Sequence, residues 1–208
     1  MRYLLAVLAL YSSTVAAQPR TDEAGLTVLL KGDSVPAPVL RAMRREAESE
    51  FAPSGVKLNW GSSQDLQGAA INGQIAIVGL RGQCGPEAPA RALPPPLGEG
   101  SEALGQTHMV NGKVLPMADV LCDAVHQLVD RDLRAAQAGE REKLLGRALG
   151  RVVAHELYHI ILRTTDHARS GLLRPALTSA ELLAPRNAIG ERDEHRITDS
   201  AGTDSGGR

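Results

Sequence analysis

The chain has 208 residues, 43% of them apolar, and a formal net charge of −1 at pH 7. Its 23 basic and 24 acidic residues are mixed along the sequence, so there is no extended positive patch for nucleic acid or acidic membranes. The sequence has few large aromatic residues: one tryptophan, three tyrosines and one phenylalanine. The composition therefore argues against aromatic platforms for single-stranded nucleic acid or carbohydrate, and the length suggests one domain.

The N-terminus has the layout of a secretory signal peptide. A positive start at Arg2 is followed by an apolar run over 3–11 and by small residues up to a cleavage site after Ala17. The apolar run is shorter than the roughly 20 residues that a membrane-spanning helix needs. We therefore expect residues 1–17 to be removed, leaving a secreted or periplasmic protein with no membrane span.

Export to an oxidising compartment changes the interpretation of the two cysteines. Cys84 and Cys122 can pair there, and a bond that closes so long a loop would constrain the unfolded chain. The sequence therefore predicts a disulfide between them.

The first half of the chain predicts the order strand, helix, strand, strand. Short apolar runs at 26–31, 56–60 and 74–80 predict strands, and apolar residues at helical spacing predict a helix at 36–51. Many glycines and prolines predict a long irregular loop over 81–102. Such a loop could be a lid, a substrate rim or an inhibitory plug, and the sequence leaves this open.

The second half predicts a hairpin followed by helices. Asn111-Gly112 is a strong hairpin signal between strands at 104–110 and 113–117. Weak helical spacing follows at 119–138, and a wide apolar stripe predicts a long helix at 140–163.

A short final helix is predicted by a capping box. Thr178 is the expected N-cap and Glu181 its partner at the third helical position. The composition then turns polar and glycine-rich, which predicts a disordered tail over 185–208 after a single domain over 18–184.

The long helix carries the motif H-E-x-x-H. Residues four apart share one face of a helix, so His155 and His159 can both direct an imidazole nitrogen at one metal ion. Two histidines and a third ligand leave one position of a tetrahedral Zn²⁺ open for a water molecule. Glu156 is then placed to act as the general base in hydrolysis of a peptide bond.

The third ligand has three candidates. The helix is expected to end near Arg163, after which the chain can fold back and bring His167 to the metal. Asp166 is an adjacent oxygen donor that could instead cap or orient a turn. Glu181 matches the glutamate ligand of another class of zinc peptidase, although the capping box gives it a structural role.

The stretch 153–183 resembles the zinc site of the metzincin clan of metallopeptidases, which are zincins with a further histidine after H-E-x-x-H. The resemblance implies His155, His159 and His167 as zinc ligands and Glu156 as catalytic base. It also implies an α+β fold: a small zincin-like domain with a twisted mixed sheet, a backing helix, an active-site helix and a short C-terminal helix.

Two features depart from the clan's pattern. The clan places its third histidine six residues after the second with a glycine midway, whereas His167 comes two residues later and Leu162 stands at the glycine position. The clan also places a methionine beneath the metal, but no methionine follows Met117, and Leu172 or Leu173 could take that place.

The resulting hypothesis is a secreted or periplasmic zinc metalloendopeptidase, acting on peptides or proteins. The alternative is an exported metal-binding or inactive zincin-like protein without peptidase activity. A closed site with four protein ligands would mark the alternative, and an open position facing a cleft would mark the enzyme. The sequence does not indicate the cleavage specificity or the oligomeric state.

Overall fold

A computed structural model describes residues 25–32, 35–62, 74–87, 103–169, 171–185, 196–197 and 200. The predicted signal peptide lies outside these ranges, as does the greater part of the predicted loop and of the predicted tail. Among the helices in the described ranges, none combines the length and the hydrophobicity that a bilayer crossing requires.

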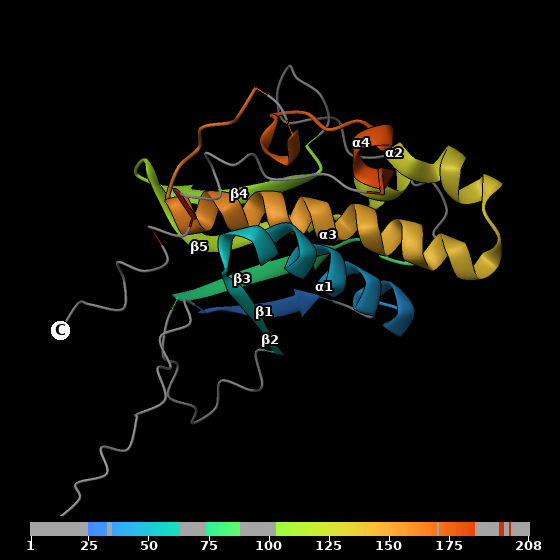
Figure 1. The fold of residues 1–208 in the computed structure, drawn as a ribbon, viewed down its shortest axis with the longest axis horizontal. Helices are drawn as coiled ribbons and strands as arrows, with labels where there is room; N and C mark the ends of the chain where they lie inside the picture. The colour runs from blue at the N-terminus through green and yellow to red at the C-terminus, as the bar shows by residue number, and fades with distance from the viewer. Residues whose placement is uncertain are drawn as a thin grey trace, which may run out of the picture.

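Strands and helices follow one another in nearly the predicted order (Figure 1). The elements are β1 (Gly25–Gly32), α1 (Ala37–Phe51), β2 (Lys57–Ser62), β3 (Gln74–Arg81), β4 (Gly105–Val110), β5 (Lys113–Leu121), α2 (Cys122–Ala135), α3 (Ala138–Leu162) and α4 (Ser179–Leu183), with 3-10 turns at Ala52–Ser54 (η1) and Gly171–Leu173 (η2). The largest difference from the predicted bounds is at β5, which continues to Leu121 because its last residues still pair with β3. The helix predicted from 119 therefore begins only at Cys122.

The described strands form one five-stranded mixed sheet in the order β2-β1-β3-β5-β4. β2, β1, β3 and β5 pair in parallel, and β4 is antiparallel to β5 at the edge of the sheet. The two-residue turn predicted between β4 and β5 is confirmed, since Asn111 and Gly112 both have positive φ, of 50° and 73°. The predicted mixed α and β fold class is thus confirmed, with the sheet mostly parallel.

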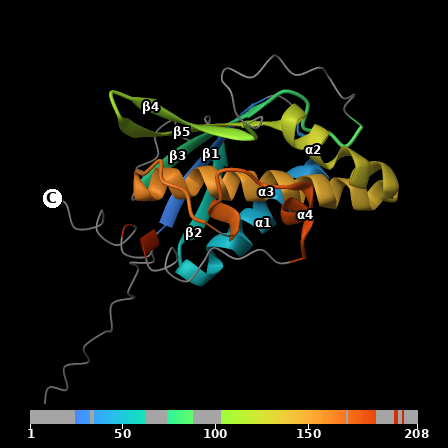
Figure 2. The ribbon, with the colours of Figure 1, turned by 90° about the horizontal axis from the view of Figure 1, so that it is seen from above.

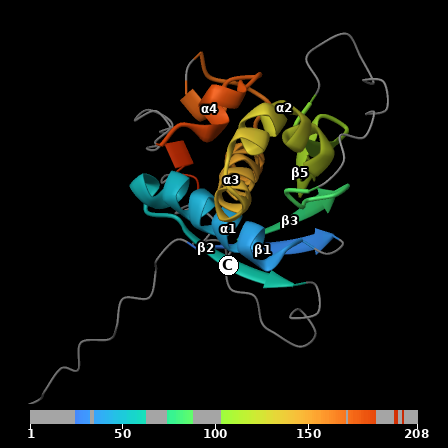
Figure 3. The ribbon, with the colours of Figure 1, turned by 90° about the vertical axis from the view of Figure 1, so that its right-hand side faces the viewer.

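One face of the sheet packs on α1 and α3 (Figure 3). Alternate strand residues supply that face, and apolar residues of both helices cover it: Leu26, Val28, Ala76, Val78, Ala118 and Val120 from the strands, and Val39, Met43, Leu149 and Val153 from the helices.

Two glycines of α3 let it approach α1 closely. A Cβ at Gly146 would lie 2.4 Å from the Ala42 side chain, and one at Gly150 would lie 2.5 Å from the Met43 carbonyl oxygen.

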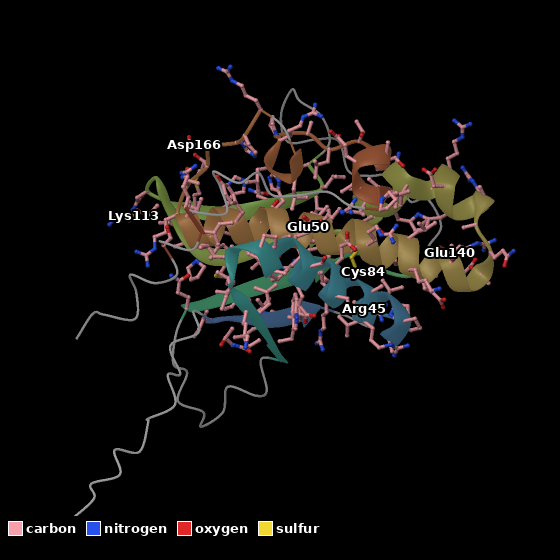
Figure 4. All side chains as sticks on the ribbon, viewed as in Figure 1. Arg45, Glu50, Cys84, Lys113, Glu140 and Asp166 are labelled. Atoms are coloured by element: carbon pink, nitrogen blue, oxygen red, sulfur yellow. A yellow bond between two sulfur atoms is a disulfide. The ribbon has the colours of Figure 1, made fainter. Side chains whose placement is uncertain are left out.

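A buried ionic cluster joins α1, α3 and α4. The Arg151 guanidinium on α3 is fully buried, and its Nε lies 2.9 Å from Oε1 of Glu46 and 3.3 Å from Oε1 of Glu50 on α1. Its other nitrogens donate to the backbone carbonyls of Glu181 and Ala184 at the end of α4. Each of the three guanidinium nitrogens therefore has a partner within the protein. Figure 4 shows Glu50 between α1 and α3.

The predicted disulfide between Cys84 and Cys122 is confirmed. It ties the chain just after β3 to the first turn of α2, and the bond is visible in yellow beside the Cys84 label in Figure 4. Both cysteines are buried, and the loop they close contains the β4–β5 hairpin.

Part of the predicted C-terminal tail packs on the body. Ile197 is fully buried in the core, and Arg196 donates to the Tyr158 hydroxyl at 3.3 Å. These residues are held by the same apolar burial that holds the helices. The rest of the predicted tail, apart from 185 and Ser200, lies outside the described residues.

Candidate metal centre and catalytic cleft

The H-E-x-x-H motif lies in the last two turns of α3. The helix ends at Leu162, and Arg163 turns the chain back with a left-handed backbone of φ 50°. The Thr164 amide donates to the His159 carbonyl at 3.2 Å, which closes the end of the helix. The predicted helix end near Arg163 is confirmed, and the chain beyond it returns toward the motif.

Two backbone carbonyls fix the imidazoles of the motif. Nδ1 of His155 lies 2.9 Å from the Leu172 carbonyl oxygen, and Nδ1 of His159 lies 2.9 Å from the Thr164 carbonyl oxygen. A carbonyl oxygen can only accept, so each Nδ1 must carry the proton and donate it. Each neutral ring then offers the lone pair of Nε2, which is the arrangement that orients histidine ligands in metal sites.

The two Nε2 atoms face each other at 3.1 Å. Their lone pairs would repel at this distance unless a proton or a cation lies between them. Burial lowers the pKa of His155 and, with the neighbouring His155 ring, lowers the pKa of His159 to about 4, so the surroundings disfavour the charged form of both rings. Two nitrogens bound to one tetrahedral Zn²⁺ lie about 3.3 Å apart, so the donor set fits this metal.

His167 completes a group of three histidines. Its ring centroid lies 5.3 Å from that of His155 and 4.8 Å from that of His159, and the ligand atoms of all three lie within 4.8 Å of one another. Among the described residues, these three histidines are the cluster that could hold a metal ion. His167 is exposed, so the cluster is open toward solvent on that side.

The other two candidates for the third ligand do not belong to this group of ligand atoms. The exposed Asp166 donates its amide to the Thr164 hydroxyl at 3.0 Å, and in Figure 4 its label lies near the motif end of α3. Glu181 forms the predicted capping box with Thr178 and also pairs with Arg174. The capping box is confirmed, and the geometry favours His167 over both alternatives.

Glu156 is buried beside the cluster, against strand β4. Its Oε2 accepts a hydrogen bond of 2.6 Å from the Thr107 hydroxyl. Burial raises the pKa of this carboxyl to about 7, an effect that hydrogen bonds from the Thr107 side chain and backbone oppose. The site thus holds a carboxyl group that can take up and release a proton near neutral pH.

A cavity of about 630 Å³ opens onto these residues. Its walls come from β4, α2, α3 and the segment 164–177, and its lining includes His155, Glu156, His159 and His167. Figure 2 shows the β4–β5 hairpin on one side of α3 and α4 on the other. Leu104, Leu128, Val152 and Leu177 give part of the cavity an apolar lining.

The remaining described histidines and the tyrosine of the motif have other partners. His108 lies 3.0 Å from the Asp119 carboxylate, and the buried His126 lies 3.2 Å from the Pro86 carbonyl oxygen. Tyr158 is 1% exposed and packs in the core. These three side chains therefore have structural contacts within the protein, and His195 lies outside the described residues.

Sequence reasoning suggested Leu172 or Leu173 beneath the metal, but it did not identify the hydrogen bonds that Thr107 of β4 and Leu172 of η2 make with the motif. Thr107 precedes Glu156 by 49 positions, and Leu172 follows His155 by 17. Neither contact leaves a local pattern, because the hydroxyl and the carbonyl come from elements placed by the fold. For the contact between Thr107 and Glu156, the sequence offers one weak signal. This signal is a threonine two residues after a glycine at the start of the predicted hairpin.

Comparisons with known proteins do not assign a family. No family model matches the chain, and no curated protein does. Among solved structures, the chain is similar to one described as "GM1 bound form of the ECX AB5 holotoxin". The two share 12% sequence identity with a TM-score of 0.42, over 87% of this chain and 79% of that chain. A likeness this distant carries no argument about activity.

Proposed function

We propose that this protein is an exported zinc metalloendopeptidase that hydrolyses peptide bonds. The observation that carries the proposal is the pair of Nε2 atoms of His155 and His159, which face each other at 3.1 Å while both Nδ1 atoms donate to carbonyls. His167 adds a third nitrogen, and three protein ligands leave one position of a tetrahedral metal open. That open position favours an enzyme over a closed structural site.

The residues around the metal have separate roles in this proposal. Zinc, when bound, would lower the pKa of a coordinated water and polarise the scissile carbonyl. The Glu156 carboxylate accepts the proton of the attacking water and passes it to the leaving amine. The Leu172 and Thr164 carbonyls keep the two imidazoles in the tautomer that binds metal.

Strand β4 provides a place for an extended peptide. It is the edge strand of the sheet and supplies the cavity residues Gly105, Gln106, Thr107 and Met109. A peptide backbone can add to such an edge through main-chain hydrogen bonds, with side chains directed into pockets. This form of recognition needs few aromatic residues, in agreement with the composition.

The metzincin resemblance remains part of the proposal. A mixed sheet, a long motif helix and a third histidine after a chain reversal support it. The reversal is made by Arg163 in a left-handed conformation, one residue after the position where the clan has a glycine. The disulfide is consistent with an extracellular location, which supports the proposed secretion or periplasmic export.

The test uses the chain from Gln18 onward, produced with its disulfide formed. We expect about one zinc per molecule by metal analysis and cleavage of unfolded casein that stops when a chelator removes the zinc. Glu156→Gln should keep the zinc and lower kcat/KM by about 10²-fold or more, because it removes the proton acceptor.

A matched control is Glu140→Gln, which changes an exposed glutamate in the first turn of the same helix. This variant should keep both zinc and activity. A wild-type protein without zinc would overturn the metal site. Stoichiometric zinc without hydrolysis of casein or of a peptide library would instead support the metal-binding alternative.

A further inference from the structure

Strand β4 approaches the motif helix at Glu156. We propose that Thr107 is a positioning residue, which holds the Glu156 carboxylate in one orientation for proton transfer, and that Gly105 leaves the space this orientation needs. The inference rests on the proposed function, because it assigns a support to the proposed base. It concerns this chain's own strand and adds no ligand to the metal.

The contact between the two side chains is short and partly buried. The Thr107 hydroxyl lies 2.6 Å from Oε2 of Glu156, and Glu156 is 5% exposed. The same hydroxyl lies 3.4 Å from the Glu156 backbone carbonyl, so it reaches both ends of the residue. A hydrogen bond to an ionised carboxylate is stronger and more directional than one between neutral groups.

The missing side chain of Gly105 is the second observation. A Cβ placed there would lie 2.6 Å from Oε1 of Glu156 and 3.0 Å from both Cγ and Cδ. Any other residue would therefore push the carboxylate off the strand. Gly105 and Thr107 point to the same face of β4, since they are two residues apart in a strand, so one oxygen rests against the glycine while the other is held by the threonine.

This arrangement limits the flexibility of the Glu156 side chain. A glutamate side chain has three rotatable bonds, and a base acts only when its oxygen lies within hydrogen-bond reach of the proton it takes. The donation to Oε2 restrains the last of these bonds and leaves Oε1 to accept the proton. The His155 and His159 rings are fixed by carbonyls, and Thr107 gives the base a corresponding anchor.

The experiment compares Thr107→Val, which removes the hydroxyl but keeps the shape, with Thr107→Ser, which keeps the hydroxyl. We expect Thr107→Val to lower kcat about 10- to 100-fold with KM changed less than about twofold. Thr107→Ser should recover most of the lost kcat. The matched control is Thr27→Val on β1, which makes the same chemical change in a strand outside the cavity and should leave kcat unchanged.

A double substitution separates positioning from a general structural effect. In the Glu156→Gln background, Thr107→Val should lower the residual rate by less than about twofold, because the group it positions is already absent. An equal loss in both backgrounds would overturn the proposal. Gly105→Ala gives a second route to the same displaced carboxylate, and it should lower kcat while the hydroxyl remains.

Two readouts do not depend on activity. Zinc affinity, measured by competition with a chelator, should stay within about twofold in Thr107→Val, since the hydrogen bonds of the Thr107 hydroxyl go to Glu156, which is not a proposed ligand. Crystal structures of the metal-free wild type and of Thr107→Val should show the Glu156 carboxylate on β4 in the first and rotated away in the second. An unmoved carboxylate, or an unchanged kcat in an active enzyme, would overturn the positioning role. A wild type that never cleaves peptides would overturn the proposed function, while the crystallographic arm would still decide whether Thr107 anchors Glu156.

Discussion

Helix α3 buries two polar clusters only one turn apart, and they are satisfied in different ways. Arg151 is fully buried against Glu46 and Glu50 of α1, and its remaining donors reach backbone carbonyls of α4. His155 and His159 are also buried, yet their Nε2 atoms face one another with no opposite charge between them.

The difference separates a structural cluster from a binding site. Burying a polar group is costly unless it is paired. The arginine cluster contains its own counter-charges, so it can hold α1, α3 and α4 together without a ligand. The histidine cluster brings three ligand nitrogens together, so it could hold a metal ion. Substitution in the arginine cluster should therefore lower the free energy of unfolding, whereas substitution in the histidine cluster should remove the stabilisation that metal provides.

The largest expected effect is at the arginine cluster. Arg151→Met should lower the free energy of unfolding by about 3–5 kcal/mol, because it leaves the buried Glu50 carboxylate without its counter-charge and removes the donor to Glu46 and to two carbonyls of α4. Urea unfolding followed by circular dichroism measures this change. Arg134→Met, which removes an exposed arginine paired with Asp130 on α2, should cost less than about 1 kcal/mol. Similar losses of unfolding free energy in both variants would show that the buried arginine contributes no more to stability than the exposed one.

The next effect concerns metal at the histidine cluster. Zinc at 100 times its Kd should raise the free energy of unfolding of the wild type by about 2.7 kcal/mol. His159→Ala should lose this increase, because one of the two facing nitrogens is gone. His108→Ala should retain it, since His108 pairs with Asp119 outside the cluster. Equal zinc stabilisation of all three proteins would mean that the metal binds elsewhere.

The smallest effect is a pH dependence of the arginine cluster. Burial raises the pKa of Glu50 from 4.5 to about 7, against the opposing charge of Arg151. The folded protein therefore binds more protons than the unfolded chain between these values, so stability falls as pH rises through this window. Relative to Glu50→Gln, the wild type should lose about 1–2 kcal/mol between about pH 5.5 and 7. Unfolding at several pH values, with a chelator present, measures the difference. A flat difference would show that Glu50 is ionised throughout.

The sequence predicted the parts of the molecule that local patterns encode. Apolar patterns predicted most of the strands and helices, a capping box predicted α4, Asn111-Gly112 predicted the hairpin, and four-residue spacing placed His155 and His159 on one face of α3. The reversal that brings His167 back was also predicted, because Thr164 and the residues after it favour the end of a helix.

Contacts between distant segments were beyond such patterns. The anchor from Thr107 to Glu156 depends on β4 pairing with β5, and the arginine cluster depends on α1 and α4 meeting across α3. Arg151 occupies a position that reads as an ordinary polar interruption of an apolar stripe. Its burial follows from the tertiary arrangement, as does the choice of Leu172 as the carbonyl partner of His155.

The disulfide also decides what happens when the chain is cut. A single cleavage anywhere between Cys84 and Cys122 leaves two pieces that remain covalently joined. A cut within 88–102 would keep β1 to β3 on one piece and the hairpin, Glu156 and all three histidines on the other. The complete candidate site would then be carried by one fragment, tethered to the sheet that supports it. The chain would thereby tolerate nicking, which would be visible as fragments that separate on a gel only after reduction.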